Sequence, residues 1–162
     1  MQYMNKVFLL IGGNIGDRLQ NLHQAITGLS AVCGPVIQQS AEYETAAWGK
    51  TDQAAFLNQA LLLTTSLPAQ ELITIILSVE EDMGRRRMEK FGPRVIDIDI
   101  LFFNDEIINE PNLIIPHPQL QNRRFALAPM HEIAPALVHP LLHKTIEQLL
   151  RECKDELPVK KI

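Results

Sequence analysis

Sulfur chemistry and long apolar runs are both scarce in this chain. Its 162 residues include only two cysteines, Cys33 and Cys153, which match neither zinc-ligand spacing nor a disulfide framework. Both are expected to be reduced thiols of a cytoplasmic protein. The apolar run at residues 7–11 is too short for a signal peptide, and no stretch approaches the roughly 20 apolar residues of a membrane span. The sequence therefore predicts a soluble protein inside the cell, with no membrane partner.

An excess of positive charge is also missing. Fifteen Lys and Arg residues face 19 Asp and Glu residues, which gives a net charge of −4. A surface of this kind has no long-range attraction for nucleic acid, although a local basic cluster can still bind phosphates. The hydrophobic and charged fractions, 46% and 21%, are ordinary for a globular protein of one-core length. We therefore expect residues 1–162 to form a single domain, and a monomer because no coiled-coil pattern or long apolar edge stands out.

The order of apolar patterns predicts an α+β fold. The order strand, helix, strand, strand, helix, strand is that of the ferredoxin-like plan. It predicts a mainly antiparallel sheet with helices packed on one face. The expected elements are a strand at 7–11, a turn at 12–16, a helix capped by Asp17, strands at 36–43 and 56–65, a helix from Pro68 to Gly84, a strand at 95–103, a proline-containing loop at 109–122, and short helices at 123–130 and 145–152.

The most informative local pattern is Asp97-Ile98-Asp99 inside a predicted strand. Side chains at i and i+2 of a strand point to the same face, so the two carboxylates would lie side by side while Ile98 faces the core. Two adjacent carboxylates repel each other unless a cation lies between them, and magnesium commonly takes one or two carboxylates together with substrate phosphates. The alternative is an ordinary polar strand face at the surface, and the spacing by itself leaves both open.

A basic cluster directly precedes this pair. It could be a solvated loop, but cations beside a carboxylate pair are also what a magnesium–polyphosphate complex requires, because guanidinium groups bind the phosphate oxygens that the metal leaves uncovered. Farther along, His117 is held between two prolines and Arg123 follows it, so both could donate to phosphate, although a lone loop histidine is more often structural. The cluster consists of Arg85, Arg86, Arg87, Lys90 and Arg94.

Taken together, these segments resemble one enzyme family, the 6-hydroxymethyl-7,8-dihydropterin pyrophosphokinases. Residues 90–101, which contain the acidic pair, resemble the diagnostic segment of that family. The resemblance extends over nearly the whole chain, and several spaced motifs in the right order are far more specific than any one of them. The other matching segments are residues 11–14, 43–45, 56–58, 116–117, 122–125 and 132–135.

This resemblance implies an activity and a set of roles. The enzyme would transfer pyrophosphate from ATP to 6-hydroxymethyl-7,8-dihydropterin in folate biosynthesis, and its small-molecule partners would be these two substrates. Asp97 and Asp99 would bind two Mg²⁺ ions. The residues implied in catalysis are Arg85, Arg87, Arg94, Asp97 and Asp99; those implied in ATP binding are Glu80, Arg85, Arg94, Ile100, His117 and Arg123; those implied in pterin binding are Thr45, Trp48, Phe56, Asn58 and Phe125.

Two other classes of protein were weighed against this one. A small-molecule-binding regulatory domain of ferredoxin-like shape needs neither an acidic pair nor a basic loop beside it. A two-metal nucleotidyl transferase also uses paired aspartates, but the net charge of −4 argues against a nucleic-acid substrate. The residues fit attack at either the β or the γ phosphorus of ATP, and only the family resemblance selects the β position and hence AMP as the product.

Overall fold

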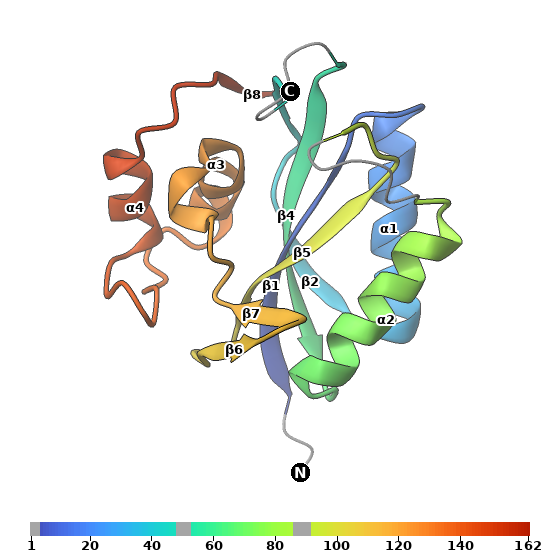
Figure 1. Cartoon of the computed structure of the whole chain (residues 1–162), viewed down its shortest axis with the longest axis horizontal. Helices are drawn as coiled ribbons and strands as arrows, with labels where there is room; N and C mark the ends of the chain where they lie inside the picture. Colours follow the sequence, from blue (N-terminus) through green and yellow to red (C-terminus); the bar gives the residue numbers. More distant parts are fainter. Residues whose placement is uncertain (1–3, 48–52, 86–91) are drawn as a thin grey trace.

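The computed structural model describes residues 4–47, 53–85 and 92–162. Figure 1 shows a central sheet with helices beside it. Trp48 and Arg87, and with them Arg86 and Lys90, lie outside the described residues. The elements are β1 (Asn5–Gly13), α1 (Arg18–Val32), β2 (Val36–Gln39), β3 (Tyr43–Thr45), β4 (Phe56–Thr65), α2 (Ala69–Asp82), β5 (Asp97–Phe103), β6 (Ile108–Glu110), β7 (Leu113–Ile115), the 3-10 helix η1 (Leu120–Asn122), α3 (Arg124–Ile133), α4 (Ile146–Glu152) and β8 (Val159–Lys161).

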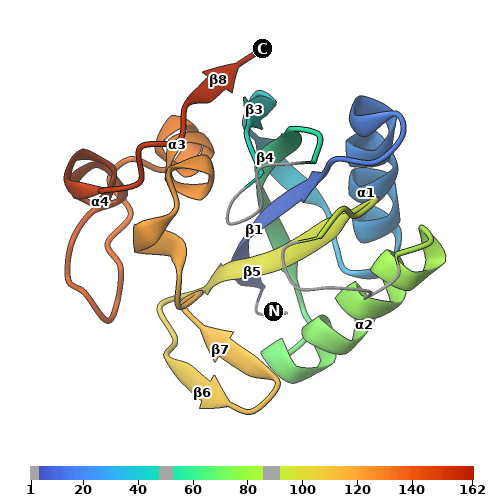
Figure 2. The same ribbon diagram turned by 45° about the horizontal axis from the view of Figure 1, so that its top comes forward.

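The main sheet is antiparallel and has the order β5-β1-β4-β3-β8, with β2 also paired to β4. Strand β1 lies between β4 and β5, and its pairing with β4 runs from Asn5 opposite Thr65 to Gly13 opposite Leu57. In Figure 2, β1 and β5 cross the middle of the view, while β3 and β8, at the other end of the strand order, lie near its top. This mixture of helices and antiparallel sheet confirms the predicted α+β class.

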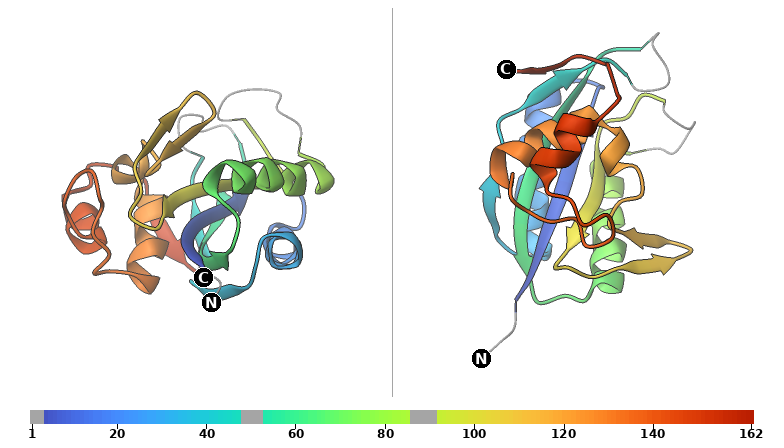
Figure 3. Two further views of the ribbon diagram at one scale, coloured as in Figure 1. Left: turned by 90° about the horizontal axis from the view of Figure 1, so that it is seen from below. Right: turned by 90° about the vertical axis from the view of Figure 1, so that its left-hand side faces the viewer.

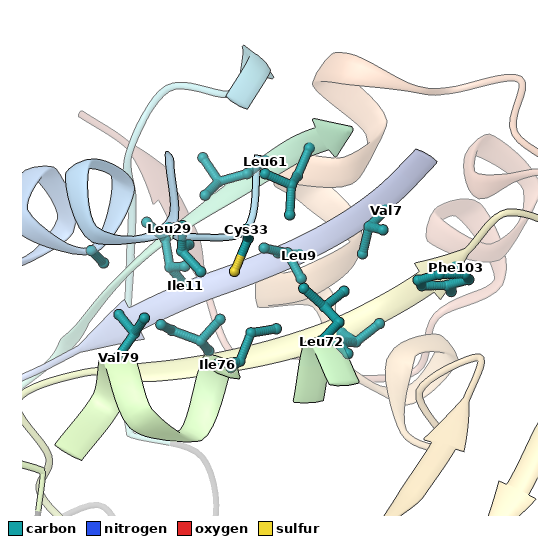
Figure 4. Packing of buried hydrophobic residues seen from close by; sticks show 14 of the residues in the cluster. Val7, Leu9, Ile11, Leu29, Cys33, Leu61, Leu72, Ile76, Val79 and Phe103 are labelled. Carbon is teal, nitrogen blue, oxygen red and sulfur yellow. The ribbon is translucent and has the colours of Figure 1, made fainter. Parts of the chain in front are cut away.

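Helices cover both faces of this sheet, so the prediction of a single covered face was wrong. Val7, Leu9 and Ile11 of β1 are buried against α1 and α2, together with Leu72 and Ile76. Figure 4 shows this packing at close range. The alternate β1 residues belong to a second buried cluster with α3 and α4, on the opposite side of the sheet (Figure 3); its members include Phe8, Leu10, Leu127, Met130 and Leu149. The cause is visible in β1, which is apolar at every position from residue 7 to 11 rather than alternating.

Three segments differ from the predicted elements. The expected strand at 36–43 is two strands, β2 and β3. Between them, Ser40 donates its backbone amide to the Ala60 carbonyl at 2.9 Å, but the Ala60 amide donates to the Ser40 hydroxyl at 3.0 Å instead of to a backbone carbonyl. The expected loop at 109–122 contains the β6–β7 hairpin and η1. Strand β8 was not foreseen, since a three-residue strand has too short a pattern to detect. In the part of the chain that the structure describes, no helix is long and apolar enough to cross a membrane.

Candidate active site

The acidic pair lies on the α3 side of the sheet, near the end of β1. In the pairing of β5 with β1, Asp97 lies opposite Gly12 and Asp99 lies opposite Leu10. On the other side of β1, Gly12 is opposite Asn58 of β4. Ile98 and Ile100 are buried in the α1–α2 cluster, while Asp97 and Asp99 remain partly exposed. The predicted same-face arrangement is therefore confirmed, and Gly12 of β1 lies between Asp97 and Asn58 in the sheet.

Two glycines in β1 leave room for this site. A Cβ atom on Gly12 would lie 2.2 Å from Oδ1 of Asn58, and one on Gly13 would lie 2.2 Å from the carbonyl oxygen of Val95. Both glycines lie within β1 rather than in the predicted turn. Their lack of a side chain lets Asn58 and the backbone of Val95 approach β1 closely. Next to them, the side-chain oxygen of Asn14 accepts from the backbone amide of Arg94 at 2.9 Å. The backbone amide of Asn14 donates to the Arg94 carbonyl at 3.0 Å. Asn14 thus fixes the end of the basic segment beside β1, a role that the sequence analysis missed.

Arginines reach Asp97 from two sides. The Arg94 Nη1 atom lies 2.9 Å from Oδ2 of Asp97, and Nη1 of Arg85 lies 3.2 Å from Oδ1. Glu80, at the end of α2, accepts from Nη1 of Arg85 at 2.8 Å and from the Ile98 amide at 2.7 Å. Arg85 and Arg94, the two described members of the basic cluster, are therefore beside the acidic pair as the sequence predicted, and the buried Glu80 connects α2 to the start of β5.

The carboxylates at this site carry more negative charge than their surroundings readily stabilise. Burial, reinforced by the charge of Asp97, raises the pKa of Asp99 to about 8 against the opposing effect of Arg123. Burial also raises the pKa of Glu80, although the Ile98 amide and Arg85 oppose the shift. A cation placed between Asp97 and Asp99 would reverse this penalty.

Two carboxylates on one strand face are donors that suit a hard cation such as Mg²⁺. Within residues 4–47, 53–85 and 92–162, no group of three His, Cys, Asp or Glu side chains could hold a metal ion. Asp97 and Asp99 would supply two carboxylates, and the remaining ligands would come from phosphate oxygens and water. That division is typical of Mg²⁺, which retains waters and binds substrate phosphates, whereas structural zinc takes four protein ligands.

His117 and Arg123 lie beside the same carboxylates. Burial lowers the pKa of His117 to about 4, helped by the nearby charge of Arg123 and opposed by Asp97. Its Nδ1 atom accepts the Gln119 amide at 3.1 Å, so the neutral ring carries its proton on Nε2. Burial likewise lowers the pKa of Arg123, against the effect of Asp99 and Asp97. A neutral donor and a cation therefore lie together near the acidic pair.

A candidate subsite for a flat polar ring adjoins this cluster on β4. The side chain of Asn58 is buried, and its Nδ2 atom has no hydrogen-bond partner among the described residues. A buried donor in this state costs stability until a ligand accepts from it. The Phe56 ring, two residues away, lies 5.8 Å from the Arg94 guanidinium carbon, and the Phe125 ring lies 5.7 Å from that of Arg123. Each aromatic ring thus lies against an arginine that is a candidate to bind phosphate.

Two further predicted residues offer less through their side chains. The Thr45 hydroxyl donates to the Pro158 carbonyl at 3.0 Å, and the Ile100 side chain is buried in the α1–α2 cluster. Any contact that these residues make with a substrate would therefore come mainly from their backbone groups.

Known structures share this fold. Two solved structures of wild-type Plasmodium falciparum HPPK-DHPS, one with STZ-DHP and one with pterin and p-hydroxybenzoate, superpose with TM-scores of 0.77 and 0.75 at 19% sequence identity. Each match covers 93% of this chain, which spans only 43% and 42% of those longer chains. At this identity the likeness defines the class of fold, an antiparallel sheet with flanking helices as found in that protein.

Sequence comparison gives the family. The model of the 7,8-dihydro-6-hydroxymethylpterin-pyrophosphokinase (HPPK) family matches residues 8–135, and the chain belongs to this family. The relatives include 2-amino-4-hydroxy-6-hydroxymethyldihydropteridine pyrophosphokinases of Aquifex aeolicus, 41% identical over 92% of each chain, and of Synechocystis, 42% identical over 88% of this chain and 73% of that one. The resemblance drawn from the sequence motifs is confirmed.

Proposed function

We propose that this chain transfers the pyrophosphate group of ATP to 6-hydroxymethyl-7,8-dihydropterin, giving AMP and the pterin pyrophosphate in folate biosynthesis. Membership of the HPPK family and the names of the relatives support this reaction. The observation in the structure that carries it is the Asp97–Asp99 pair, with Arg85 and Arg94 paired to Asp97. On the far side of β1, the Asn58 Nδ2 atom has no hydrogen-bond partner among the described residues.

The triphosphate would lie between the acidic pair and the basic side chains. Asp97 and Asp99 would hold two Mg²⁺ ions, which when bound would neutralise phosphate charge and lower the pKa of the attacking hydroxyl. Arg85 and Arg94, now paired with Asp97, would turn to the phosphate oxygens, while Arg123 and the Nε2–H of His117 would donate from the opposite side. Transfer of a phosphoryl centre depends mainly on such positioning and charge neutralisation.

The pterin would bind next to β4. Asn58 can both donate and accept, so one side chain can read the polar edge of the ring. Phe56 and Phe125 would stack on its two faces, and backbone groups near Thr45 would complete the edge. With these groups holding the ring, the hydroxymethyl oxygen would approach the β phosphorus of ATP. It would lie in line with the bond from that phosphorus to the α–β bridging oxygen, which breaks as AMP leaves.

The whole chain fits one catalytic domain of ferredoxin-like plan. The βαββαβ order β1-α1-β2/β3-β4-α2-β5 gives the sheet sequence β5-β1-β4-β2/β3, in which the last strand lies beside the first. The helices α3 and α4 and strand β8 are then additions to that plan. We assign residues 1–162 to a single pyrophosphokinase domain.

Nucleotide chromatography tests the proposal directly. The purified chain is incubated with ATP, Mg²⁺ and 6-hydroxymethyl-7,8-dihydropterin, with parallel reactions that omit the pterin or replace Mg²⁺ with EDTA. AMP and the pterin pyrophosphate are expected in equal amounts, and only in the complete reaction. ADP as the main nucleotide would make the chain an ordinary kinase. Absence of turnover, with pterin still bound, would favour a binding domain.

A further inference from the structure

The segment after α4 joins the start of α3 to strand β3. Residues 153–162, here called the C-terminal strap, leave α4, pass the start of α3 and end as β8 against β3; Figure 2 shows this path. The strap lies beyond residues 8–135, the part matched by the family model. None of its residues belongs to the site described above.

Its first anchor is on α3. The Asp155 carboxylate accepts from the backbone amide of Arg124 at 3.1 Å through Oδ2, while Oδ1 accepts from the Leu157 amide at 3.1 Å. In return, the Arg124 guanidinium donates to the carbonyls of Asp155 at 2.9 Å and Cys153 at 3.0 Å. The residue at the N-cap position of α3, Arg123, makes no side-chain cap bond. Asp155 therefore supplies, from the strap, the acceptor and negative charge that a helix N-terminus favours.

Its second anchor is on β3. Strand β8 pairs antiparallel with β3, with Val159 opposite Thr45, and the Pro158 carbonyl accepts from the Thr45 hydroxyl at 3.0 Å. Beyond β8, the Ile162 amide donates to the Glu42 carbonyl at 3.1 Å. The strap thus holds the full length of β3.

One anchored element carries a residue of the proposed pterin subsite, and the other pairs with the strand that carries the rest of it. The first turn of α3 carries Phe125, directly after Arg124. Strand β3 holds β4 by pairing Thr45 with Phe56 and Tyr43 with Asn58. We propose that the C-terminal strap is a positioning element for the pterin, with Asp155 as its key residue. It fixes the first turn of α3 relative to β3 and β4, so that Phe125 faces the ring held at Phe56 and Asn58. This inference rests on the proposed function.

The test uses the full-length chain with Asp155→Ala, Asp155→Asn and Glu156→Ala. Glu156 is the neighbouring strap carboxylate and is exposed, so it controls for charge. Calorimetry measures binding of 6-hydroxymethyl-7,8-dihydropterin in the presence of Mg²⁺ and α,β-methylene ATP, and of the ATP analogue alone. Hydrogen exchange of the amides at 41–45 and 124–127 is measured in the ligand-free proteins.

Asp155→Ala is expected to weaken pterin binding at least about tenfold and to speed exchange at 124–127. Its affinity for the ATP analogue should change less than about threefold, because only Arg123 among the proposed phosphate ligands adjoins the turn that Asp155 holds. Asp97, Arg85 and Arg94 lie at or next to β5 and α2, away from the β8 end of the sheet. Asp155→Asn, which keeps a side-chain acceptor, should recover part of the pterin affinity, and Glu156→Ala should match the wild type.

Unchanged pterin affinity in Asp155→Ala would overturn the proposal, as would equal losses for both ligands, which would indicate a general loss of structure. The measurements on the wild type distinguish failure of the proposed function from failure of the positioning role of the strap. A wild type that binds no pterin would remove the function, and exchange at 124–127 would still report whether Asp155 orders that turn. Unchanged exchange there would remove the positioning role itself.

Discussion

At the scale of single residues, the site combines side chains whose ionisation or hydrogen bonding is incomplete without a ligand. The pKa of Asp99 is raised to about 8, chiefly by burial, and the Asn58 amide is buried with Nδ2 unpaired in the described structure. Arg85 and Arg94 balance part of the charge by pairing with Asp97. Groups of this kind gather where a charged substrate is to bind, because the folded chain alone does not satisfy them.

Asp97→Asn and Asp99→Asn should each reduce turnover at least tenfold, about 1.4 kcal/mol or more in barrier height. Each substitution removes a charge that would hold a metal while keeping the side-chain shape, so the fold should survive. Steady-state rates of AMP formation and melting temperatures measure the two effects. Asp105→Asn, an exposed carboxylate in the turn after β5, is the matched control and should remain close to wild type. A rate within tenfold of wild type for either site variant would contradict the two-metal assignment.

His117 should make the ligand-free protein more stable as the pH rises from about 4 to 6.5. The pKa of His117 in the folded protein is lowered to about 4 from 6.5, so across this range the unfolded chain binds a proton that the folded chain does not. Acidification therefore favours unfolding through this residue, and the penalty is absent above 6.5. Urea unfolding of the wild type and His117→Gln at several pH values measures it. The stability of the wild type relative to the variant should fall on acidification, and a pH-independent difference would contradict the lowered pKa.

At the scale of elements, β1 and β4 form the centre of a three-layer arrangement. Successive residues of β1 alternate between the α1–α2 cluster and the α3–α4 cluster, so the strand is apolar on both faces. Helix α3 contributes to the second layer although Pro129 lies within it. The first turn of this same helix carries Phe125 and follows Arg123, so packing of the second layer also places part of the site.

Both layers should contribute comparably to stability. Leu72→Ala in α2 and Leu127→Ala in α3 each empty a fully buried site, and each should lower the free energy of unfolding by about 2–5 kcal/mol. Leu77→Ala, on the exposed side of α2, should cost less than about 1 kcal/mol. Chemical denaturation gives all three values. A near-neutral Leu127→Ala would mean that α3 does not cover a core.

At the scale of the whole molecule, the two ends of the strand order β5-β1-β4-β3-β8 are covered or charged. On β5, the Ile98 amide donates to Glu80 and the Leu101 carbonyl accepts from the His117 amide. At the other edge, β8 is three residues long and carries Lys160 and Lys161. Short, charged or covered edges disfavour pairing with a second sheet.

The protein is accordingly expected to be a monomer. Sedimentation equilibrium across a range of concentrations should give a mass near 18.3 kDa at each concentration. A mass near twice that value, or one that rises with concentration, would contradict the expectation and point to an interface elsewhere on the surface.

The sequence by itself determined the family, the carboxylate pair and the basic segment, because each depends on neighbours along the chain. Strand periodicity suffices to put Asp97 and Asp99 on one face, and the motif containing them is contiguous. Strand β4 and helices α1 and α2 were foreseen for the same reason, since their apolar patterns are long and regular.

Only the tertiary structure decided which distant residues meet. The contact of Gly12 with Asn58 depends on the register of β1 with β4, which no local pattern states. The second helical layer depends on short helices whose apolar residues become a core only when β1 presents its other face. The strap depends on hydrogen bonds between Asp155 and Arg124, 31 residues apart, whose geometry exists only after α4 has folded back across α3.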